Sequence, residues 1–315
     1  MKLPDLPMKE YKYLPTELLN DFSKSYSRSF PEVKLNSTSI LSFLNRKFQR
    51  LSEGRFHNIS ALITMDGRVA SGYGIIRNKY SNYGKEISVG LICDVFTDPD
   101  FRKMGLFKKV SLLAIKRESL SETKFLIGFP IRNEVMPGHL SVGWRYIFDM
   151  HIWWAFPRIG SYKNISKNPD LDATMFSAQD RKISILPSSE YLDWRFSLFE
   201  VDYYLIRVSN STDFAIVRKS RIKRLPFTCI IFIQTTSIEN SRKIVNKIRN
   251  FSLRLGTLGV IGCWNDSYAD DLFLKTSGLN QSTKVQKVII RELNSFECPN
   301  NEYEYRLSWL DSDTL

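Results

Sequence analysis

The chain has 315 residues, of which 43% are hydrophobic and 13% aromatic, and this composition excludes a disordered polypeptide and makes two domains the default. Its formal net charge of +12 favours anionic partners, namely nucleic acid, an anionic membrane or small phosphorylated molecules. The four cysteines and three histidines show no metal-ligand spacing, and neither a signal-peptide core nor a membrane-spanning apolar run occurs, so we expect a cytoplasmic protein with reduced thiols and no metal.

The first 85 residues alternate between helical and strand-like patterns. Apolar residues recur at helical spacing in the first part, and β-branched and aromatic residues dominate the second. The expected elements are helices at 16–22 and 38–51, strands at 56–64 and 69–77 joined by a turn at 65–68, and a loop at 78–85. We expect Gly72 and Gly74 to weaken the second strand.

The next strand leads into a helix start that suits a phosphate. The apolar run from Ile87 to Val95 indicates a strand covered on both faces, and Pro99 marks the turn after it. A helix expected from Leu106 would leave its first N–H groups unpaired and pointing in one direction, where the helix dipole adds positive potential. A pyrophosphate would fit there, although an ordinary strand, turn and helix on a basic surface is the alternative.

This stretch resembles motif A of the GNAT acyltransferases, whose consensus is (Gln/Arg)-x-x-Gly-x-(Gly/Ala) at a helix start. Arg102 and Gly105 match, whereas Phe107 replaces the small residue, a departure that resembles a subgroup associated with sugar and polysaccharide chemistry. The resemblance covers residues 14 to about 155 and implies acetyl-CoA or another short acyl-CoA as co-substrate. The CoA-binding residues that it implies are Val95, Thr97, Arg102, Lys103, Met104, Gly105, Leu106, Phe107 and Asn133.

The segment after the expected strand 125–129 extends the resemblance. Asn133 and the Gly143-Trp144 pair match family positions, and His139 stands where many members carry a tyrosine acid. His139 is therefore a candidate acid, with packing under a loop as the alternative. Asp94 and Glu134 are candidate bases, and Glu134 has a solvated helix-start carboxylate as its alternative.

A second domain is expected after a linker rich in glycine, proline and serine. The predicted limits are 1–158 for the first domain, 159–185 for the linker and 186–315 for a second, GNAT-like domain. The elements expected there are helices at 191–196, 241–255 and 268–279 and strands at 203–208, 214–217, 227–233, 258–263, 285–291 and 303–310. The loop before the helix at 241 has no glycine or arginine, so we expect it not to bind a pyrophosphate.

Two segments of the second domain are candidates for substrate binding. They recur in two-domain GNAT proteins that resemble sugar-biosynthesis enzymes, and the residues concerned are Tyr191, Trp194, Arg195, Asp311 and Asp313. A cation could bind a phosphate, an aromatic ring could stack on a base or sugar, and the carboxylates could bind hydroxyls or an amine. Core packing, an internal ion pair and a solvated terminus are the alternatives. The basic run 218–224 is interpreted as a solvated hairpin rather than a nucleic-acid site.

Together these features predict an α/β protein with two tandem GNAT-like domains, each a mostly antiparallel mixed sheet flanked by helices. The function that the resemblance implies is N-acylation of a nucleotide-linked (dTDP- or UDP-) amino sugar for O-antigen lipopolysaccharide, with no nucleic-acid or membrane partner and the oligomeric state open, a homodimer included. A tRNA-dependent aminoacyltransferase of the tandem-GNAT kind and a non-catalytic nucleotide-binding protein are the alternatives.

Overall fold

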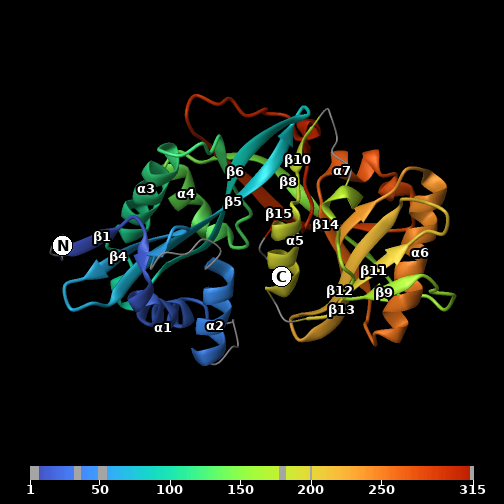
Figure 1. Cartoon of the computed structure of the whole chain (residues 1–315), viewed down its shortest axis with the longest axis horizontal. Coiled ribbons are helices and arrows are strands. Elements are labelled where there is room, and N and C mark those ends of the chain that lie inside the picture. Colours follow the sequence, from blue (N-terminus) through green and yellow to red (C-terminus); the bar gives the residue numbers. More distant parts are fainter. Residues whose placement is uncertain (1–6, 32–36, 49–54, 177–181, 199–200, 313–315) are drawn as a thin grey trace. The chain divides into compact units, whose positions relative to one another are not determined.

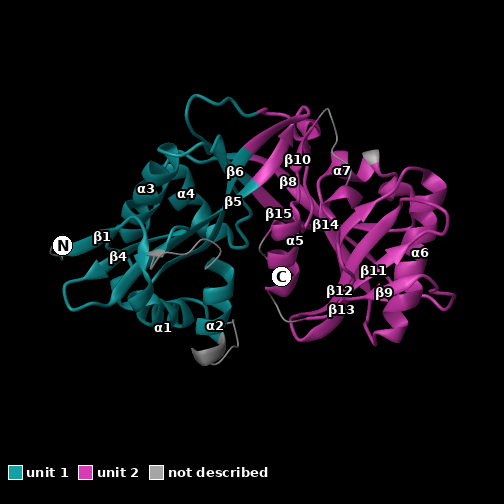
Figure 2. Cartoon of the chain, in the orientation of Figure 1, with its two compact units in different colours: residues 1–78, 88–146, 289–298 teal, residues 79–87, 147–288, 299–315 magenta. Residues whose placement is uncertain are grey.

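A computed structural model of the chain describes residues 7–31, 37–48, 55–176, 182–198 and 201–312. The chain forms two compact units (Figure 2). Unit 1 comprises residues 1–78, 88–146 and 289–298, and unit 2 comprises residues 79–87, 147–288 and 299–315. Both are built from mixed sheets flanked by helices, so the predicted α/β fold class is confirmed.

Unit 1 contains a sheet in the order β1-β4-β5-β6-β7-β15, with helices on both sides (Figure 1). Its strands are β1 (Met8–Tyr11), β2 (Leu14–Pro15), β3 (Arg55–Phe56), β4 (Ile59–Thr64), β5 (Val69–Asn82), β6 (Lys85–Thr97), β7 (Phe125–Gly128) and the end of β15 (Asn280–Glu292). Its helices are η1 (Thr16–Leu18), α1 (Leu19–Ser29), α2 (Ser37–Phe48), η2 (Pro99–Phe101), α3 (Leu106–Ser119), η3 (Asn133–Val135) and α4 (Met136–Ser141).

The alternation of side chains along β5 allows helices to pack on both faces of this sheet. A Cβ added at Gly72 would lie 2.6 Å from the Phe22 ring of α1, and one at Gly74 would lie 3.0 Å from the Phe48 ring of α2. On the opposite face, Tyr73 packs in one core cluster with Val110 of α3. The glycines give the helices a close approach, and the strand continues to Asn82, beyond its expected end at residue 77. That they weaken β5 stays a prediction.

Unit 2 has the order β15-β8-β14-β13-β12-β11-β9, with a small additional pairing of β10 to β16 and to the end of β5. Its strands are β8 (Arg145–Ala155), β9 (Ile165–Lys167), β10 (Ile183–Ile185), β11 (Tyr203–Arg207), β12 (Phe214–Ile222), β13 (Leu225–Gln234), β14 (Val260–Trp264), the start of β15 and β16 (Tyr305–Arg306). Its helices are η4 (Ala173–Met175), α5 (Ser189–Ser197), α6 (Ile238–Arg254), α7 (Asp266–Asp271), η5 (Leu274–Thr276) and η6 (Glu302–Glu304).

Several stretches differ from the sequence-based expectation. The helix expected at 268–279 is a shorter α7 at Asp266–Asp271 followed by η5. The expected loop at 78–85 is mostly strand, because a tight turn with positive φ at Tyr83 (52°) and Gly84 (80°) joins β5 directly to β6. The expected linker 159–185 contains the strands β9 and β10 and the turn η4. The strand expected at 303–310 shrinks to Tyr305–Arg306.

The two units share one strand order but each takes its last strand from the other half of the sequence. In unit 1, β4-β5-β6-α3-β7 ends beside β15, and in unit 2, β11-β12-β13-α6-β14 ends beside β8. β15 pairs antiparallel with β7 at Ile289–Glu292, and β8 pairs antiparallel with β14. Ile289 accordingly belongs to the same core cluster as Leu126 and Val110. The predicted division at 158 and 186 does not follow these units, since β8 counts with unit 2 from Ile147 and 289–298 count with unit 1.

The core of unit 1 should therefore depend on a residue near the carboxyl end of the sequence. Ile289→Ala removes a fully buried side chain and should lower the free energy of unfolding by about 2–5 kcal/mol, whereas Val285→Ala, on an exposed part of the same strand, should change it by less than about 0.5 kcal/mol. Urea denaturation followed by tryptophan fluorescence measures both. Equal small effects would show that β15 contributes little to this core.

Candidate functional site

The strands β6 and β7 separate after a short parallel pairing. Among the described residues, Val89–Leu91 of β6 pair with β7. β7 then ends at Gly128, while β6 continues to Thr97. Since Leu91 lies opposite Ile127, β7 ends opposite Ile92, and the backbone of β6 from Cys93 to Thr97 extends beyond it. An open strand edge of this kind offers N–H and C=O groups to an extended ligand, and Val95 and Thr97, both half-buried, lie on it.

The predicted base Asp94 lies in this open part of β6, at a break in the strand geometry. Its φ is 48°, and its side chain is 8% exposed. Its Oδ1 accepts a hydrogen bond from the Tyr26 hydroxyl at 3.2 Å, and its Oδ2 forms an ion pair with the Lys47 Nζ at 2.7 Å. Both carboxylate oxygens therefore already have partners from α1 and α2, and its role as a base stays a prediction.

Sequence reasoning missed Lys47 and Tyr26, although Lys47 carries a signal. Lys47 falls on the apolar stripe of α2, in register with Leu44 and Phe48, and its side chain is only 2% exposed. A lysine on the buried face of an amphipathic helix indicates a buried acidic partner, because an unpaired ammonium group is too costly to bury. The identity of that acidic partner could be found only from the three-dimensional structure.

After β6 the chain turns through η2 into an open helix start. Gly105, the N-cap of α3, has φ 72° and ψ 6° and makes no side-chain cap, and Lys103 also has a positive φ of 65°. A Cβ added at Gly105 would meet nothing within 4 Å. Space beside Gly105 at the start of α3 is therefore open, and the exposed Arg102 and Lys103 precede it in the chain. This geometry fits a bound pyrophosphate.

Local contacts hold this turn in shape. The Asp98 carboxylate accepts a hydrogen bond from the Asp100 N–H at 3.0 Å, and Phe101 is buried. Arg28 of α1 forms an ion pair with Asp100 at 2.6 Å, and the Arg102 Nε donates to the Thr97 carbonyl at 3.4 Å. These contacts therefore give the loop a defined conformation, in addition to the packing of α3 on the sheet.

Phe107, the residue that departs from the family consensus, has a specific packing site. Its ring lies against Gly138 of α4, where a Cβ would come within 2.8 Å of it, and it meets the His139 ring edge-on at 5.1 Å between centroids. His139 is 4% exposed, and burial lowers the pKa of its imidazole to about 4, so it is neutral near pH 7. Glu134 and Asn133, on η3, are both exposed. Their predicted roles and that of His139 stay predictions.

The candidate substrate residues of unit 2 come together around the last described turn of the chain. The Tyr191 hydroxyl donates to the Leu310 carbonyl at 2.7 Å, and the Arg195 guanidinium donates to the Trp309 and Ser312 carbonyls at 3.2 and 2.9 Å. Trp194 stacks at a tilt on Tyr191, with 5.6 Å between centroids.

These contacts make α5 an anchor for that turn. Arg195 is 1% exposed, so its guanidinium is directed to main-chain carbonyls rather than to solvent. Its predicted phosphate contact stays a prediction. Asp313 lies outside the described residues.

Asp311 is fully enclosed in the same turn. Its Oδ2 accepts a hydrogen bond from the Ser308 N–H at 2.7 Å, and the residue is 1% exposed. Burial raises the pKa of its carboxyl to about 7, against the weaker lowering effect of the Ser308 and Tyr80 hydrogen bonds. A carboxyl held in this way is a structural group whose charge changes near neutral pH, and its predicted substrate role is untested.

The counterpart of the open loop in unit 2 is closed. Here β13 leads into α6, whose N-cap Ser237 accepts a hydrogen bond from the Asn240 N–H. The buried Asp213 carboxylate accepts hydrogen bonds from the Thr236 hydroxyl at 3.1 Å and the Asn240 side-chain amide at 2.6 Å. An internal carboxylate therefore lies at the helix start where an external anion would bind.

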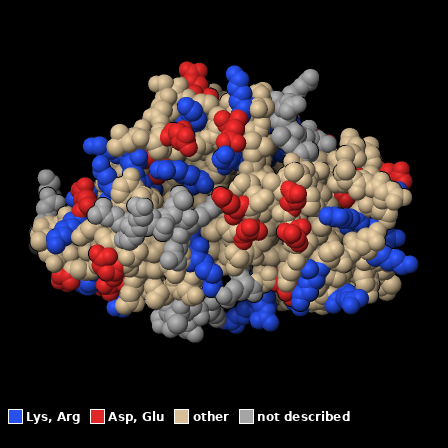
Figure 3. Space-filling view, in the orientation of Figure 1, with Lys and Arg blue, Asp and Glu red and all other residues tan. Residues whose placement is uncertain are grey.

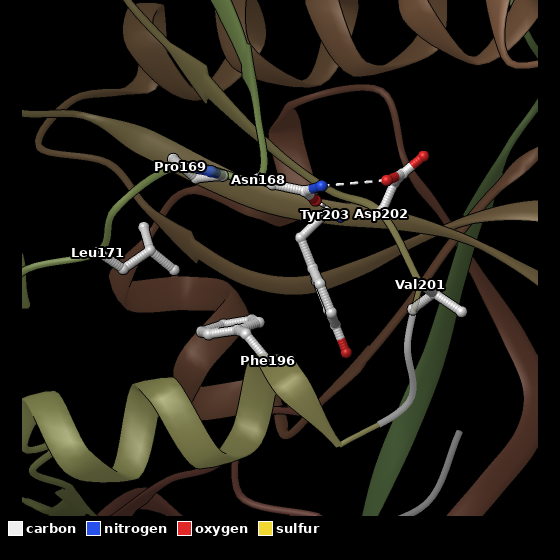
Figure 4. Close-up of a pocket in the computed structure, with 7 residues that line it drawn as sticks. All are labelled: Asn168, Pro169, Leu171, Phe196, Val201, Asp202 and Tyr203. Carbon is white, nitrogen blue, oxygen red and sulfur yellow. Dashed lines mark hydrogen bonds between the residues drawn. The ribbon is translucent and has the colours of Figure 1, made fainter.

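Two further features of the described surface lie apart from the predicted site residues. On the face shown in Figure 3, lysine and arginine side chains are interspersed with aspartate and glutamate. A pocket of about 340 Å³ in unit 2 (Figure 4) is lined by Asn168, Pro169, Leu171, Phe196, Val201, Asp202 and Tyr203. Its carboxylate already bonds Lys167 at 2.8 Å and Asn168 at 3.1 Å, and none of the predicted site residues lines it. Among the described residues no His, Cys, Asp and Glu cluster suits a metal ion, and no helix has the length and apolarity of a membrane span.

The Asp311 environment predicts a specific pH dependence of stability. Because its folded pKa lies above the unfolded value of about 3.9, the native state binds a proton that the unfolded chain releases, so this contribution is present at low pH and is lost as pH rises from about 4 to 7. Asp311→Asn keeps an acceptor for Ser308 but cannot titrate. The stability of the variant relative to wild type should therefore rise by up to about 4 kcal/mol between pH 4 and 8, as measured by denaturation across that range. A pH-independent difference would contradict the assignment.

Comparisons with known proteins bear on the fold. No protein-family model matches the sequence, and no curated protein matches it. A GCN5-related N-acetyltransferase from Anabaena variabilis ATCC 29413 matches with a TM-score of 0.67 and 13% identity, over 91% of this chain and 73% of its own. One from Kribbella flavida matches with a TM-score of 0.62 and 12% identity, over 91% and 71%.

A Pyrococcus horikoshii protein provisionally assigned as an acetyltransferase matches over nearly the full length of both chains. Its TM-score is 0.62 at 12% identity, and the match covers 96% of this chain and 95% of the other. Identities this low establish a shared architecture rather than a shared activity. The chain therefore has the fold of the GCN5-related N-acetyltransferases, the GNAT fold.

Proposed function

We propose that the chain is an acyl-CoA-dependent N-acyltransferase whose CoA site lies in unit 1. The observation that carries this proposal is the open start of α3, where Gly105 has a positive φ and an unobstructed Cα next to two exposed cations. In the GNAT fold seen here, this helix start lies at the end of the strand that separates from its neighbour. A nucleotide pyrophosphate and an extended arm could then be bound together.

The described residues supply each part of such a site. The N–H groups from Lys103 to Phe107 would bind the pyrophosphate, with Arg102 adding positive charge at the rim. The open edge of β6 at Val95 and Thr97 would pair with the pantetheine arm as an additional strand does. These are the residues that the motif resemblance implies. The Thr97 carbonyl already accepts hydrogen bonds from the Ser29 hydroxyl and the Arg102 Nε, both at 3.4 Å, so a bound arm would have to share or displace them.

The chemistry requires little from side chains. Bound acyl-CoA supplies a thioester carbonyl that a neutral amine can attack directly, so no covalent enzyme intermediate is needed. A backbone N–H on the open edge of β6 would stabilise the developing oxyanion, and the site would hold the amine in reach of the carbonyl. Cys93 is 5% exposed and has no part in this scheme.

For the acceptor we propose a small primary amine, with a nucleotide-linked amino sugar as the narrower hypothesis. The narrower hypothesis rests on the sequence resemblance alone. It receives no support from Arg195 and Asp311, whose side chains are buried against main-chain groups of their own unit. A tRNA acceptor is less well supported, because it would give no reason for an open anion-binding helix start.

The loop can be tested by a single substitution. Gly105→Glu places a carboxylate where the pyrophosphate would bind, and should abolish CoA binding in isothermal titration and CoA-thiol release in an assay with acetyl-CoA and a panel of amines, nucleotide-linked amino sugars included. The matched control is Gly256→Glu in unit 2, where φ is +62°. The only atom within 4 Å of a Cβ added there is the Lys219 Nζ, at 3.9 Å. It imposes similar backbone strain and should leave binding unchanged.

Three results would count against this assignment. Unchanged CoA affinity in Gly105→Glu would refute the location of the site. Equal losses in both glycine variants would attribute the effect to strain. Tight CoA binding by the wild-type protein without transfer to any amine would favour a binding protein over an enzyme.

The closed loop of unit 2 predicts one CoA per chain. The Asp213 carboxylate would repel a pyrophosphate at the start of α6. The Thr236 hydroxyl and the Asn240 side-chain amide there already donate to this carboxylate. Titration of the wild-type chain should give a stoichiometry of one, and Gly105→Glu should reduce it to zero. A variant that still binds one equivalent would place a second CoA site outside the unit 1 loop.

A further inference from the structure

A row of three rings connects the start of α3 to the core of unit 1. Phe107 is the second residue of α3, and its ring meets His139 at 85°. His139 in turn meets Trp144 at 78°, with 5.7 Å between centroids. Trp144 is 3% exposed and belongs to the core cluster that includes Leu126 and Ile289. The helix start is thereby linked to a rigid part of the molecule.

The space for Phe107 is made by α4. Gly138 has no side chain, and a Cβ there would come within 2.8 Å of one Phe107 ring carbon and 3.1 Å of another. The ring therefore fits between the backbone at Gly138 and the edge of His139. The last position of the consensus, where a small residue is expected, is large here because the neighbouring helix supplies the room.

The surroundings of His139 suit packing better than proton transfer. The residue is 4% exposed, and its Nδ1 is buried and makes no hydrogen bond with the described residues. Its ring contacts are the edges and faces of two aromatic side chains. An acid for a leaving thiolate would need a charged or well-oriented proton donor, whereas the ring contacts of His139 are with the aromatic side chains of Phe107 and Trp144.

We propose that His139 is a positioning residue, which supports the Phe107 ring and thereby holds the first N–H groups of α3 in the orientation that binds the CoA pyrophosphate. The proposal rests on the proposed function, since it concerns the same CoA site. It differs from the acid role in one measurable respect: a positioning residue affects CoA binding, whereas an acid affects turnover with saturating substrates.

The experiment compares His139→Ala with His139→Phe. The alanine variant removes both ring contacts and should weaken CoA binding about 10-fold in titration, with turnover at saturating acetyl-CoA within about 3-fold of wild type. The phenylalanine variant restores a ring that cannot carry a proton, and should keep both CoA affinity and turnover within about 3-fold of wild type. Leu140→Ala, at a 47% exposed position of the same helix, is the control and should behave as wild type.

Other outcomes overturn the proposal. If turnover at saturating substrates falls about 100-fold or more in His139→Phe while CoA affinity is unchanged, the acid role is established instead. Wild-type CoA affinity in His139→Ala would show that the ring gives no support. If thermal denaturation shows that the alanine variant does not fold, the phenylalanine variant decides, because it must bind CoA as wild type does. If the wild-type chain itself does not bind CoA, the proposed function and this inference are both refuted. Titration of the wild-type chain therefore separates failure of the proposed function from failure of this inference alone.

Discussion

The unit 1 site depends on the separation of two parallel strands. β6 and β7 pair over only three residues of β6, after which β6 continues beside β5 through Asp94 to Thr97, past the end of β7. Main-chain groups on the side of β6 that faces away from β5 could there be paired by an extended ligand. The same strand delivers the chain to η2 and to the start of α3, so the proposed ligand edge and the proposed anion site follow from one structural feature.

Packing from both faces keeps this open edge in place. On one face, the glycines of β5 let α1 and α2 approach closely, and Lys47 and Tyr26 from those helices bind the two oxygens of Asp94. On the other face, α3 packs on Tyr73 and its neighbours, and its C-terminal end is fixed by an ion pair between its buried Glu118 and Arg77 of β5 at 2.9 Å. Burying charged groups is tolerable here because each has a partner at short distance.

Unit 2 shows what happens when the same strand–helix–strand arrangement is closed. β13, α6 and β14 repeat the order of β6, α3 and β7, including the parallel strand pair. The difference is local: the start of α6 has a serine cap and the buried carboxylate of Asp213 instead of a glycine with positive φ. Two helix starts in one fold can therefore differ in ligand binding because a few side chains decide whether the N–H groups are satisfied internally.

Local features of this protein can be predicted from neighbouring residues in the chain, whereas which of them act together depends on long-range contacts. The motif from Ile87 to Leu106, the helix α3 and the closed loop before α6 could be predicted, because periodicity, Gly105 and the missing glycine are signals within a few residues of one another. The exchange of β8 and β15, the pairing of Lys47 with Asp94 and the buried positions of Arg195 and Asp311 could not. These join residues that are tens to more than a hundred positions apart, and burial of a charged side chain depends on partners that no local pattern specifies.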